Sequence, residues 1–301
     1  MKLGVQSFTV FKDFQDDFQG TLKRIKDMGF RYVEWLAFVS ENDYGMGVGL
    51  SPKEAVKIFD DNGMKLTGGI LTCLGGLSGK YPKEFFFEYD EIQKVIDWYA
   101  EAGCTAIGIA NDYFVDEEFF KKRMDAYNEL GRRCAEAGMV WLYHNHFQEM
   151  QKIGDKTILE LMVEMTDPNS VVFDWDLYWG VRGLVDPVEI IKTLGKKINR
   201  LHCKDFPFKK LDHLNVVKDL PKELVSWDNE DKYGPYPMCP PDEFTECGDG
   251  FIKWQDVINA ANEIEIPYMF VEQDFTPCSD MYESLAVSTE YLLSLKGLSL
   301  L

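Results

Sequence analysis

The segment Glu136-Ala137-Gly138-Met139-Val140-Trp141-Leu142 joins the end of an amphipathic helix to a short apolar strand. Glycine at such a joint suits the left-handed residue that closes a helix, where a side chain would clash. Three further joints have nearly the same sequence: Asp27-Met28-Gly29-Phe30, Asp61-Asn62-Gly63-Met64 and Glu101-Ala102-Gly103-Cys104. The chain therefore repeats one unit, in which a helix is followed directly by a strand.

This repeat extends along the chain. Apolar runs predict strands near residues 3–8, 31–36, 64–71, 105–110, 139–145, 170–175, 198–203 and 267–272. Amphipathic patterns predict helices near residues 16–28, 52–62, 90–102, 117–137, 155–166, 187–195, 253–264 and 279–295. Eight such units in 301 residues predict an α/β fold, a single (β/α)₈ TIM barrel that forms one domain over residues 1–301.

An open, doubly wound sheet is the alternative architecture. A nucleotide-binding sheet of that kind usually carries a glycine-rich turn after its first strand. The residues at this place, Phe8-Thr9-Val10-Phe11, contain no glycine, so the barrel is favoured.

One stretch, residues 206–250, interrupts the repeat. It is rich in proline, with aromatic residues between the prolines, and it is too long for a simple connection from a strand to a helix. It follows the seventh expected strand and so lies at the C-terminal face, where barrel enzymes place their active sites. We expect this insertion to wall or cover the site.

The composition restricts the kinds of partner. The chain has 32 basic and 51 acidic residues, and the net charge of -19 argues against nucleic acid or an anionic membrane as a partner. Its 7 cysteines include no C-x-x-C pair, which is typical of reduced thiols in the cytoplasm. No apolar stretch approaches the roughly 18 to 20 residues that span a bilayer. We therefore expect a soluble, cytoplasmic protein.

Ionisable residues follow four consecutive expected strands, the fifth to the eighth. They are His144, His146 and Glu149, then Asp174 and Asp176, then His202, Lys204 and Asp205, and finally Glu272 and Asp274. Taken alone, Asp174 is interpreted as structural, capping a loop or orienting a neighbour. Because unpaired burial of the whole set would be costly, a divalent cation is the simplest partner for it. Oxygen-rich ligation with one imidazole favours Mn²⁺, with Mg²⁺, Co²⁺ or Zn²⁺ as alternatives.

Several motifs occur in a familiar order. They are Tyr-His-Asn-His-x-x-Glu at 143–149, Asp-x-x-Trp at 176–179, His-x-Lys-Asp at 202–205, Gly-x-Gly-x-x-x-Trp at 248–254 and Val-Glu-Gln-Asp at 271–274. With these motifs the chain resembles the sugar phosphate isomerase/epimerase family, the xylose-isomerase-like barrels that include inosose dehydratases and ketose 3-epimerases. The resemblance implies one divalent metal ion held by Glu149, Asp176, His202 and Glu272.

The chain departs from this pattern at the fifth strand. In the ketose-epimerase branch the ligand glutamate lies within the strand, at a place that aligns more naturally with His144. Either Glu149 reaches back from the following loop, or His144 is the ligand. Glu149 is preferred here because a carboxylate suits a hard cation better. The departure also puts in doubt the epimerase scheme, in which both ligand glutamates carry protons.

A divalent ion can polarise the carbonyl group of a hydroxy-ketone and stabilise the enediolate that forms when a neighbouring proton leaves. Imidazole is a suitable base for that proton, so His146 is assigned as the base and His144 as its alternate. Lys204 is assigned to a developing oxyanion or a substrate oxygen, and Glu272 to proton transfer as well as ligation. The residues expected to bind substrate are Trp179, Arg182, Asp205, Gln6 and Glu34.

The first functional hypothesis is a metal-dependent isomerase or epimerase that acts on a sugar, keto-sugar or polyol through an enediolate. The second is a lyase, either an inosose-type dehydratase or an enzyme that eliminates from a 3-keto-glycoside. The third is a non-catalytic sugar-binding barrel. All three imply a small carbohydrate as the partner. The habit of the family and the aromatic run Phe85-Phe86-Phe87 also suggest a homo-oligomer.

Overall fold

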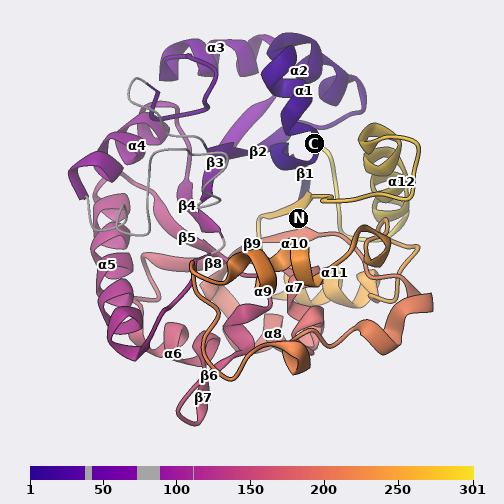
Figure 1. Cartoon of the computed structure of the whole chain (residues 1–301). Helices are drawn as coiled ribbons and strands as arrows, with labels where there is room; N and C mark the ends of the chain where they lie inside the picture. Colours follow the sequence, from indigo (N-terminus) through magenta and orange to yellow (C-terminus); the bar gives the residue numbers. More distant parts are fainter. Residues whose placement is uncertain (38–42, 73–88, 111) are drawn as a thin grey trace.

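The computed structural model describes residues 1–37, 43–72, 89–110 and 112–301. Eight parallel strands among these residues close into a barrel in the order β1-β10-β9-β8-β5-β4-β3-β2 (Figure 1). The strands are β1 (Lys2–Gln6), β2 (Tyr32–Ala37), β3 (Lys65–Thr72), β4 (Ala106–Ala110), β5 (Val140–His144), β8 (Val171–Asp176), β9 (Ile198–Cys203) and β10 (Tyr268–Val271). Each expected strand overlaps one of them, and the predicted (β/α)₈ barrel is confirmed.

The helices surround the barrel (Figure 1). Those that correspond to the eight expected helices are α2 (Phe18–Asp27), α3 (Pro52–Asp61), α4 (Tyr89–Glu101), α5 (Glu117–Glu136), α6 (Ile158–Met165), α8 (Pro187–Leu194), α11 (Trp254–Glu263) and α12 (Met281–Ser294). Glycine closes the helix at the four repeated joints, with φ of 103° at Gly29, 62° at Gly63, 72° at Gly103 and 76° at Gly138. These left-handed conformations explain why the same short sequence recurs.

Short elements between the main units were not predicted. After β1 the chain forms the 3₁₀ turn η1 (Ser7–Val10) and α1 (Phe11–Asp16), and α7 (Leu177–Arg182) follows β8 directly. A hairpin of β6 (Lys152–Ile153) and β7 (Lys156–Thr157) delays the start of α6. These segments are only a few residues long, too short for a periodic pattern to distinguish.

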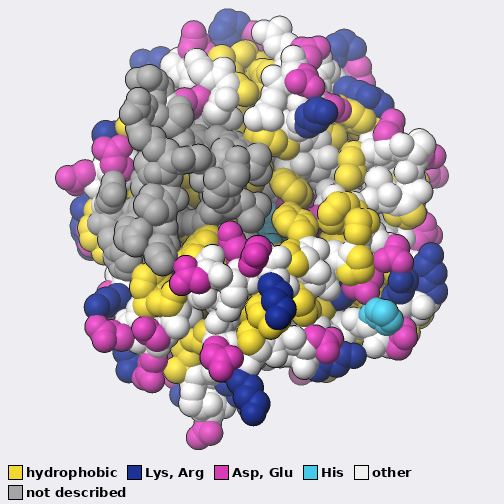
Figure 2. All heavy atoms as spheres, in the orientation of Figure 1, with side chains coloured by type: hydrophobic (Ala, Val, Ile, Leu, Met, Phe, Trp, Pro, Cys, Tyr) yellow, Lys and Arg dark blue, Asp and Glu magenta, His cyan; other side chains and the backbone are white. Residues whose placement is uncertain are grey.

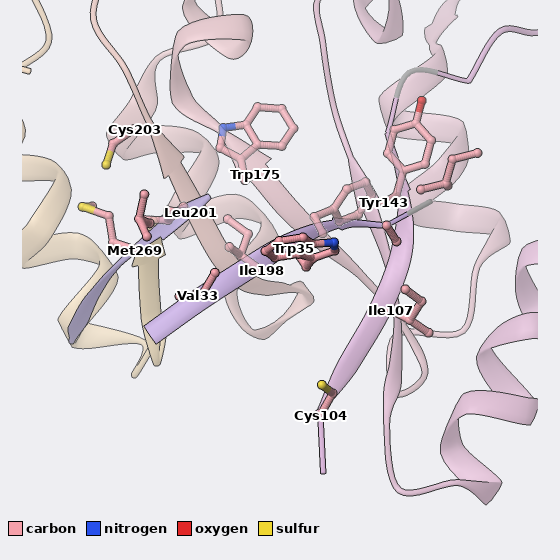
Figure 3. Packing of buried hydrophobic residues seen from close by; sticks show 14 of the residues in the cluster. Val33, Trp35, Cys104, Ile107, Tyr143, Trp175, Ile198, Leu201, Cys203 and Met269 are labelled. Carbon is pink, nitrogen blue, oxygen red and sulfur yellow. The ribbon is translucent and has the colours of Figure 1, made fainter. Parts of the chain in front are cut away.

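Side chains alternate between the two sides of the barrel wall. Odd-numbered strand residues, such as Val33, Trp35 and Trp175, belong to the main hydrophobic core between strands and helices (Figure 3). Four even-numbered strand residues form a small separate cluster: Ile70, Ala106, Leu142 and Val172. Two residues beyond Leu142 and Val172 the same alternation brings His144 and Asp174 to the barrel interior. The alternation thus fixes which residues of each strand can reach the site.

The insertion between β9 and α11 has irregular structure. It contains the 3₁₀ turns η5 (Phe208–His213), η6 (Val217–Asp219) and η7 (Pro241–Glu243) and the short helices α9 (Glu230–Tyr233) and α10 (Pro235–Met238). Isolated bridges from Asp205 to Thr245 and from Pro207 to Gly250 close its base. A second hydrophobic cluster, which includes Tyr178, Trp179 of α7 and Phe244, packs the insertion against the barrel. Aromatic burial therefore fixes the insertion beside the strand ends.

Two further expectations from the sequence concern the aromatic run at residues 85–87 and membrane-spanning segments. The aromatic run Phe85-Phe86-Phe87, on which an oligomer was partly expected, lies outside the described residues. No helix in the described part of the chain has the length and apolar composition needed to cross a membrane.

Candidate active site

A cavity opens at the C-terminal ends of the barrel strands. The empty space at this cavity, open solvent included, is about 490 Å³. Figure 2 shows a hollow near the centre of this face, with histidine side-chain atoms at its bottom. The residues that line the cavity are Gln6, Phe8, Leu36, Ile70, Ala110, His144, His146, Trp179, His202, Tyr236, Glu272 and Asp274. One side of the lining is apolar, and the other carries imidazoles and carboxylates.

Four buried side chains, three of which line this cavity, lie close enough together to hold a metal ion. His144, Asp176, His202 and Glu272 each offer one donor atom, and these atoms all lie within 4.8 Å of one another. They come from β5, β8, β9 and the residue after β10. Three of the four ligands that the sequence resemblance implied are therefore grouped. The residue from β5 is His144, the alternate.

The structure does not bring Glu149 into this cluster. Its Oε1 accepts a hydrogen bond from the Tyr143 hydroxyl at 2.6 Å, and its Oε2 accepts one from the backbone N–H of His146 at 3.0 Å. Tyr143 belongs to the core on the outer side of the barrel wall, so the Glu149 carboxyl group is held behind β5. Burial raises the pKa of Glu149 to about 7. Among the described residues, His144 takes the place for which Glu149 was preferred.

Lys204 lies among the carboxylates of the site. Its Nζ is 2.9 Å from Asp176 Oδ2, 2.5 Å from Glu272 Oε2 and 2.8 Å from Asp274 Oδ2. Burial opposes the charge on Lys204, but the three carboxylates outweigh burial and raise its pKa well above 10.5. Lys204 is therefore a permanent cation at the edge of the cluster.

His146 has the properties of a proton acceptor. Its ring packs on Trp179 with centroids 4.9 Å apart, and it lies 5.1 Å from the ring of His144. Burial, together with His144 and Lys204, lowers the pKa of His146 well below 6.5, so the ring is neutral at neutral pH. Within the described part of the chain, its Nδ1 has no hydrogen-bond partner. A neutral imidazole with an unused nitrogen thus lines the cavity.

A network of polar groups lies deeper in the barrel. Glu34 binds Arg200 at 2.6 Å through Oε1 and contacts His202 Nε2 at 2.5 Å through Oε2. Gln6, which lines the cavity, donates to Glu34 at 3.3 Å. Glu34 was expected to bind substrate, but it is not among the described residues that line the cavity, and it lies next to the candidate ligand His202.

Two other residues expected to bind substrate hold the insertion instead. Arg182 forms an ion pair with Glu243 at 2.6 Å. Asp205 accepts hydrogen bonds from Trp254 Nε1 at 2.7 Å and from the backbone N–H of Phe206 at 2.8 Å. Neither is among the described residues that line the cavity. The expected contact of Trp179 with the cavity does fit its position in the lining.

Sequence reasoning did not assign a role to Tyr236 or Asp274. Tyr236, from α10 of the insertion, lines the cavity and donates to Asp274 Oδ1 at 3.2 Å. Burial raises the pKa of Asp274 even though Lys204 opposes that effect. Asp274 was visible in the motif at 271–274. For Tyr236 the sequence offered only the flanking prolines, Pro235 and Pro237, as a signal of a fixed local conformation.

Comparison with known proteins gives a consistent picture. The family described as xylose isomerase-like TIM barrel matches residues 22–285. A solved structure described as a sugar phosphate isomerase/epimerase from Parabacteroides distasonis is 24% identical, with a TM-score of 0.74, and the alignment covers 99% of this chain and 95% of that one. At this identity the likeness shows the fold alone.

Two of the curated proteins that are similar to this chain are named inosose dehydratase. That of Bacillus anthracis is 30% identical over 178 residues, which are 59% of this chain and 52% of the relative. That of Clostridium beijerinckii is 26% identical over 151 residues, which are 50% of this chain and 45% of the relative. The chain thus spans about half the length of the curated relatives that it matches.

Proposed function

We propose, from the premise that the chain belongs to the xylose isomerase-like TIM barrel family, that it is a divalent-metal-dependent enzyme that removes water from a keto-sugar or keto-polyol. The observation that carries this proposal is the cluster of His144, Asp176, His202 and Glu272 beside His146. The cluster offers a place for a metal ion, and His146 offers a base that is separate from the ligands.

The charges in the barrel support a bound cation. Five carboxylates meet in one buried network: Glu34, Asp174, Asp176, Glu272 and Asp274. The permanent cations in the same network, Arg200 and Lys204, are fewer than the carboxylates. Although burial lowers the pKa of His202, the carboxylates raise it well above 6.5, so a bound ion would take the place of the His202 proton. A divalent ion would offset the remaining negative charge, which is otherwise costly to bury.

The donor set also indicates which ion fits. Two imidazoles and two carboxylates suit Mn²⁺, Co²⁺ or Zn²⁺, whereas Mg²⁺ prefers oxygen ligands and retained water. Mn²⁺ therefore remains the first proposal, and the second imidazole makes Mg²⁺ a poorer candidate than the sequence alone indicated. When bound, such an ion polarises a carbonyl oxygen and stabilises the negative charge that develops when the neighbouring proton leaves.

The residues of the chain account for the proton transfers. The His146 ring, which lines the cavity, takes the proton next to the carbonyl group. Lys204 is not among the described residues that line the cavity, but it contacts Glu272, which is, and so offsets negative charge that develops at this end of the site. Asp274, whose pKa is raised by burial, and Tyr236, which is bonded to it, can supply a proton to the departing hydroxyl group. Trp179 packs against His146 and limits access of water to the base.

Two arguments favour elimination over epimerisation. Elimination needs one base and one acid for the leaving group, and the site offers both. Epimerisation by the scheme that the sequence resemblance implied uses two ligand glutamates as proton carriers, and the β5 position is His144, whose Nδ1 is held by Asp174 at 3.2 Å. The curated relatives named inosose dehydratase favour the same reaction and a keto-inositol as substrate.

An epimerase or isomerase is the second candidate. Glu272 lines the cavity together with His146, so two groups that can carry a proton face the same space. If they lie on opposite faces of the substrate carbon, one can remove a proton and the other can return it.

Solvent exchange tests the proposal. The protein is incubated with Mn²⁺ in D₂O with keto-inositols and ketoses, and deuterium incorporation and loss of water are followed by NMR and mass spectrometry. We expect loss of water from a keto-inositol. Deuterium incorporation without elimination would assign an epimerase or isomerase instead. Binding of sugar and metal without any exchange would contradict an enzymatic role and leave a sugar-binding barrel.

A further inference from the structure

Asp174 contacts both imidazoles of the candidate metal cluster. A single oxygen atom, Oδ2, lies 3.2 Å from His144 Nδ1 and 3.0 Å from His202 Nε2. The two rings have centroids 4.6 Å apart, and all three residues are buried. Asp174 is not one of the four grouped donors; with Glu34 and His202 it forms a smaller group of three below them, which also shares His202.

The strand register explains this shared contact. β8 lies between β5 and β9 in the barrel. His144 of β5 pairs with Asp174, while Asp176, two residues further along β8, pairs with His202 of β9. Because residues two apart on a strand share a face, Asp174 and Asp176 both face the barrel interior between the two histidines. Asp176 is thereby placed in the cluster and Asp174 below it.

A neutral imidazole has one lone pair, and the hydrogen bond made by its other nitrogen decides which nitrogen carries it. An ionised carboxylate only accepts hydrogen bonds. Asp174 therefore favours a proton on His144 Nδ1 and on His202 Nε2. The nitrogens left to face the cluster are His144 Nε2 and His202 Nδ1, and the latter lies 3.2 Å from Glu272 Oε2.

We propose that Asp174 is the positioning residue that fixes the tautomers of His144 and His202, so that they bind a divalent metal ion through Nε2 and Nδ1 respectively. This inference rests on the proposed metal cluster. It also gives a physical reason why the β5 position tolerates an imidazole. A carboxylate ligand presents either oxygen to a metal, whereas an imidazole needs an acceptor behind it to turn the correct nitrogen forward.

The two histidines do not depend equally on Asp174. His202 Nε2 has a second acceptor, Glu34 Oε2 at 2.5 Å, which Arg200 holds from the other side at 2.6 Å. Among the described residues, the His144 ring forms a hydrogen bond with Asp174 and with no second acceptor. Loss of the Asp174 carboxylate should therefore release His144 more than His202.

The first experiment reads the tautomers of the wild-type chain directly. The protein has 4 histidines, so the ring signals in long-range ¹H–¹⁵N spectra can be assigned by single substitutions. In the Zn²⁺-loaded protein we expect His144 with its proton on Nδ1 and His202 with its proton on Nε2. The opposite tautomer at His144 would overturn the inference without need of any variant.

The second experiment measures Mn²⁺ and Zn²⁺ affinity by calorimetry in Asp174→Asn. We expect the dissociation constant to rise by about 10- to 100-fold, as for other carboxylates behind metal-bound histidines, with a smaller rise in Glu34→Gln. Asp112→Asn is the matched control, because Asp112 is equally buried but pairs with Arg123 at 2.9 Å, and neither belongs to the cluster. Its metal affinity should stay at the wild-type value.

The outcomes separate this inference from the proposed function. If the wild type binds metal and Asp174→Asn binds it equally tightly with unchanged tautomers, the positioning role is wrong and the proposed function stands. If the wild type binds neither Mn²⁺ nor Zn²⁺, the proposed metal cluster is wrong and this inference falls with it.

Discussion

The two halves of the barrel mouth carry different chemistry on the same scaffold. On β2, β3 and β4 the residues that face the cavity are Leu36, Ile70 and Ala110. On β5 and β9 they are His144 and His202, and Glu272 follows β10. All these side chains follow the same alternation of inward and outward positions. On one scaffold, the half formed by β2, β3 and β4 thus serves as an apolar wall, and the half formed by β5, β9 and the end of β10 serves as the reactive half.

Glu34 is a charged residue on a strand of the apolar half, but its contacts belong to the other half. It belongs to β2, in the apolar half, yet its carboxylate binds Arg200 and His202 of β9. The ionic network thus extends below the apolar wall and does not interrupt it. We therefore expect substitutions in the half with imidazoles and carboxylates to change metal binding and turnover. Substitutions in the apolar half should instead change the shape of the cavity and the stability of the fold.

The largest effect is expected for His202→Ala. This change removes a grouped metal donor and leaves Glu34, Asp174 and Glu272 without the imidazole that they contact. We expect the bound metal to be lost and turnover to fall by on the order of 10³ or more, because several kcal/mol of charge stabilisation depend on the ion. Elemental analysis and steady-state kinetics measure both. Full metal content in this variant would show that His202 is not a metal donor.

His146→Ala is expected to separate the base from the metal. His146 lines the cavity but is not one of the grouped donors. Metal content should remain at the wild-type value while turnover falls by about 10²- to 10⁴-fold. Titration with Mn²⁺ and the rate of deuterium exchange test the two parts. Unchanged exchange would transfer the role of base to another residue of the same half.

The fold could be predicted because its signals are local. Glycine at the helix–strand joints and the apolar runs after them identify the repeated unit, and the alternation along β8 places Asp174 and Asp176 on one face. The residues of the site were harder to predict because side chains next to each other in the sequence point to opposite sides of the strand. Tyr143 faces the core and draws Glu149 behind β5, whereas His144, one residue further, faces the barrel interior.

Long-range packing accounts for the other differences. Arg182 and Asp205 follow strand ends, where ligands are expected, but their partners are Glu243 in the insertion and Trp254 at the start of α11. Tyr236 reaches the cavity only because the insertion folds back over it. The pairing of segments some 40 to 60 residues apart is not encoded in a local pattern.

Glu149→Gln is expected to change the pH dependence of stability without affecting the reactive half. Burial raises the pKa of Glu149 from 4.5 to about 7, so folding takes up a proton between these pH values. The free energy of unfolding of the wild type therefore falls as the pH rises through this range, by roughly 3 kcal/mol at most. Glutamine resembles the protonated acid, so this part of the fall should disappear. Denaturant unfolding of both proteins at pH 4.5 and 7.5 measures the difference. If the free energy of unfolding depended on pH in the same way in both proteins, Glu149 would not be the group whose pKa is raised.

The smallest effect is expected for Ile70→Val in the apolar half. Ile70 packs with Ala106, Leu142 and Val172 and contributes to the cavity wall. Loss of one methylene group should lower the free energy of unfolding by about 0.5 to 1.5 kcal/mol and leave metal affinity unchanged. Thermal melts and calorimetry test this. A loss of metal binding here would show that the two halves are not separate.

The metal donor that we propose from β5 is His144, whereas Glu149 lies behind the strand. The most direct test compares His144→Ala with Glu149→Gln by elemental analysis after equilibration with Mn²⁺ and dialysis. The structure predicts about one ion per chain in the wild type and in Glu149→Gln, and little or none in His144→Ala. Full metal content in His144→Ala together with loss of the metal in Glu149→Gln would show that Glu149, and not His144, is the metal donor.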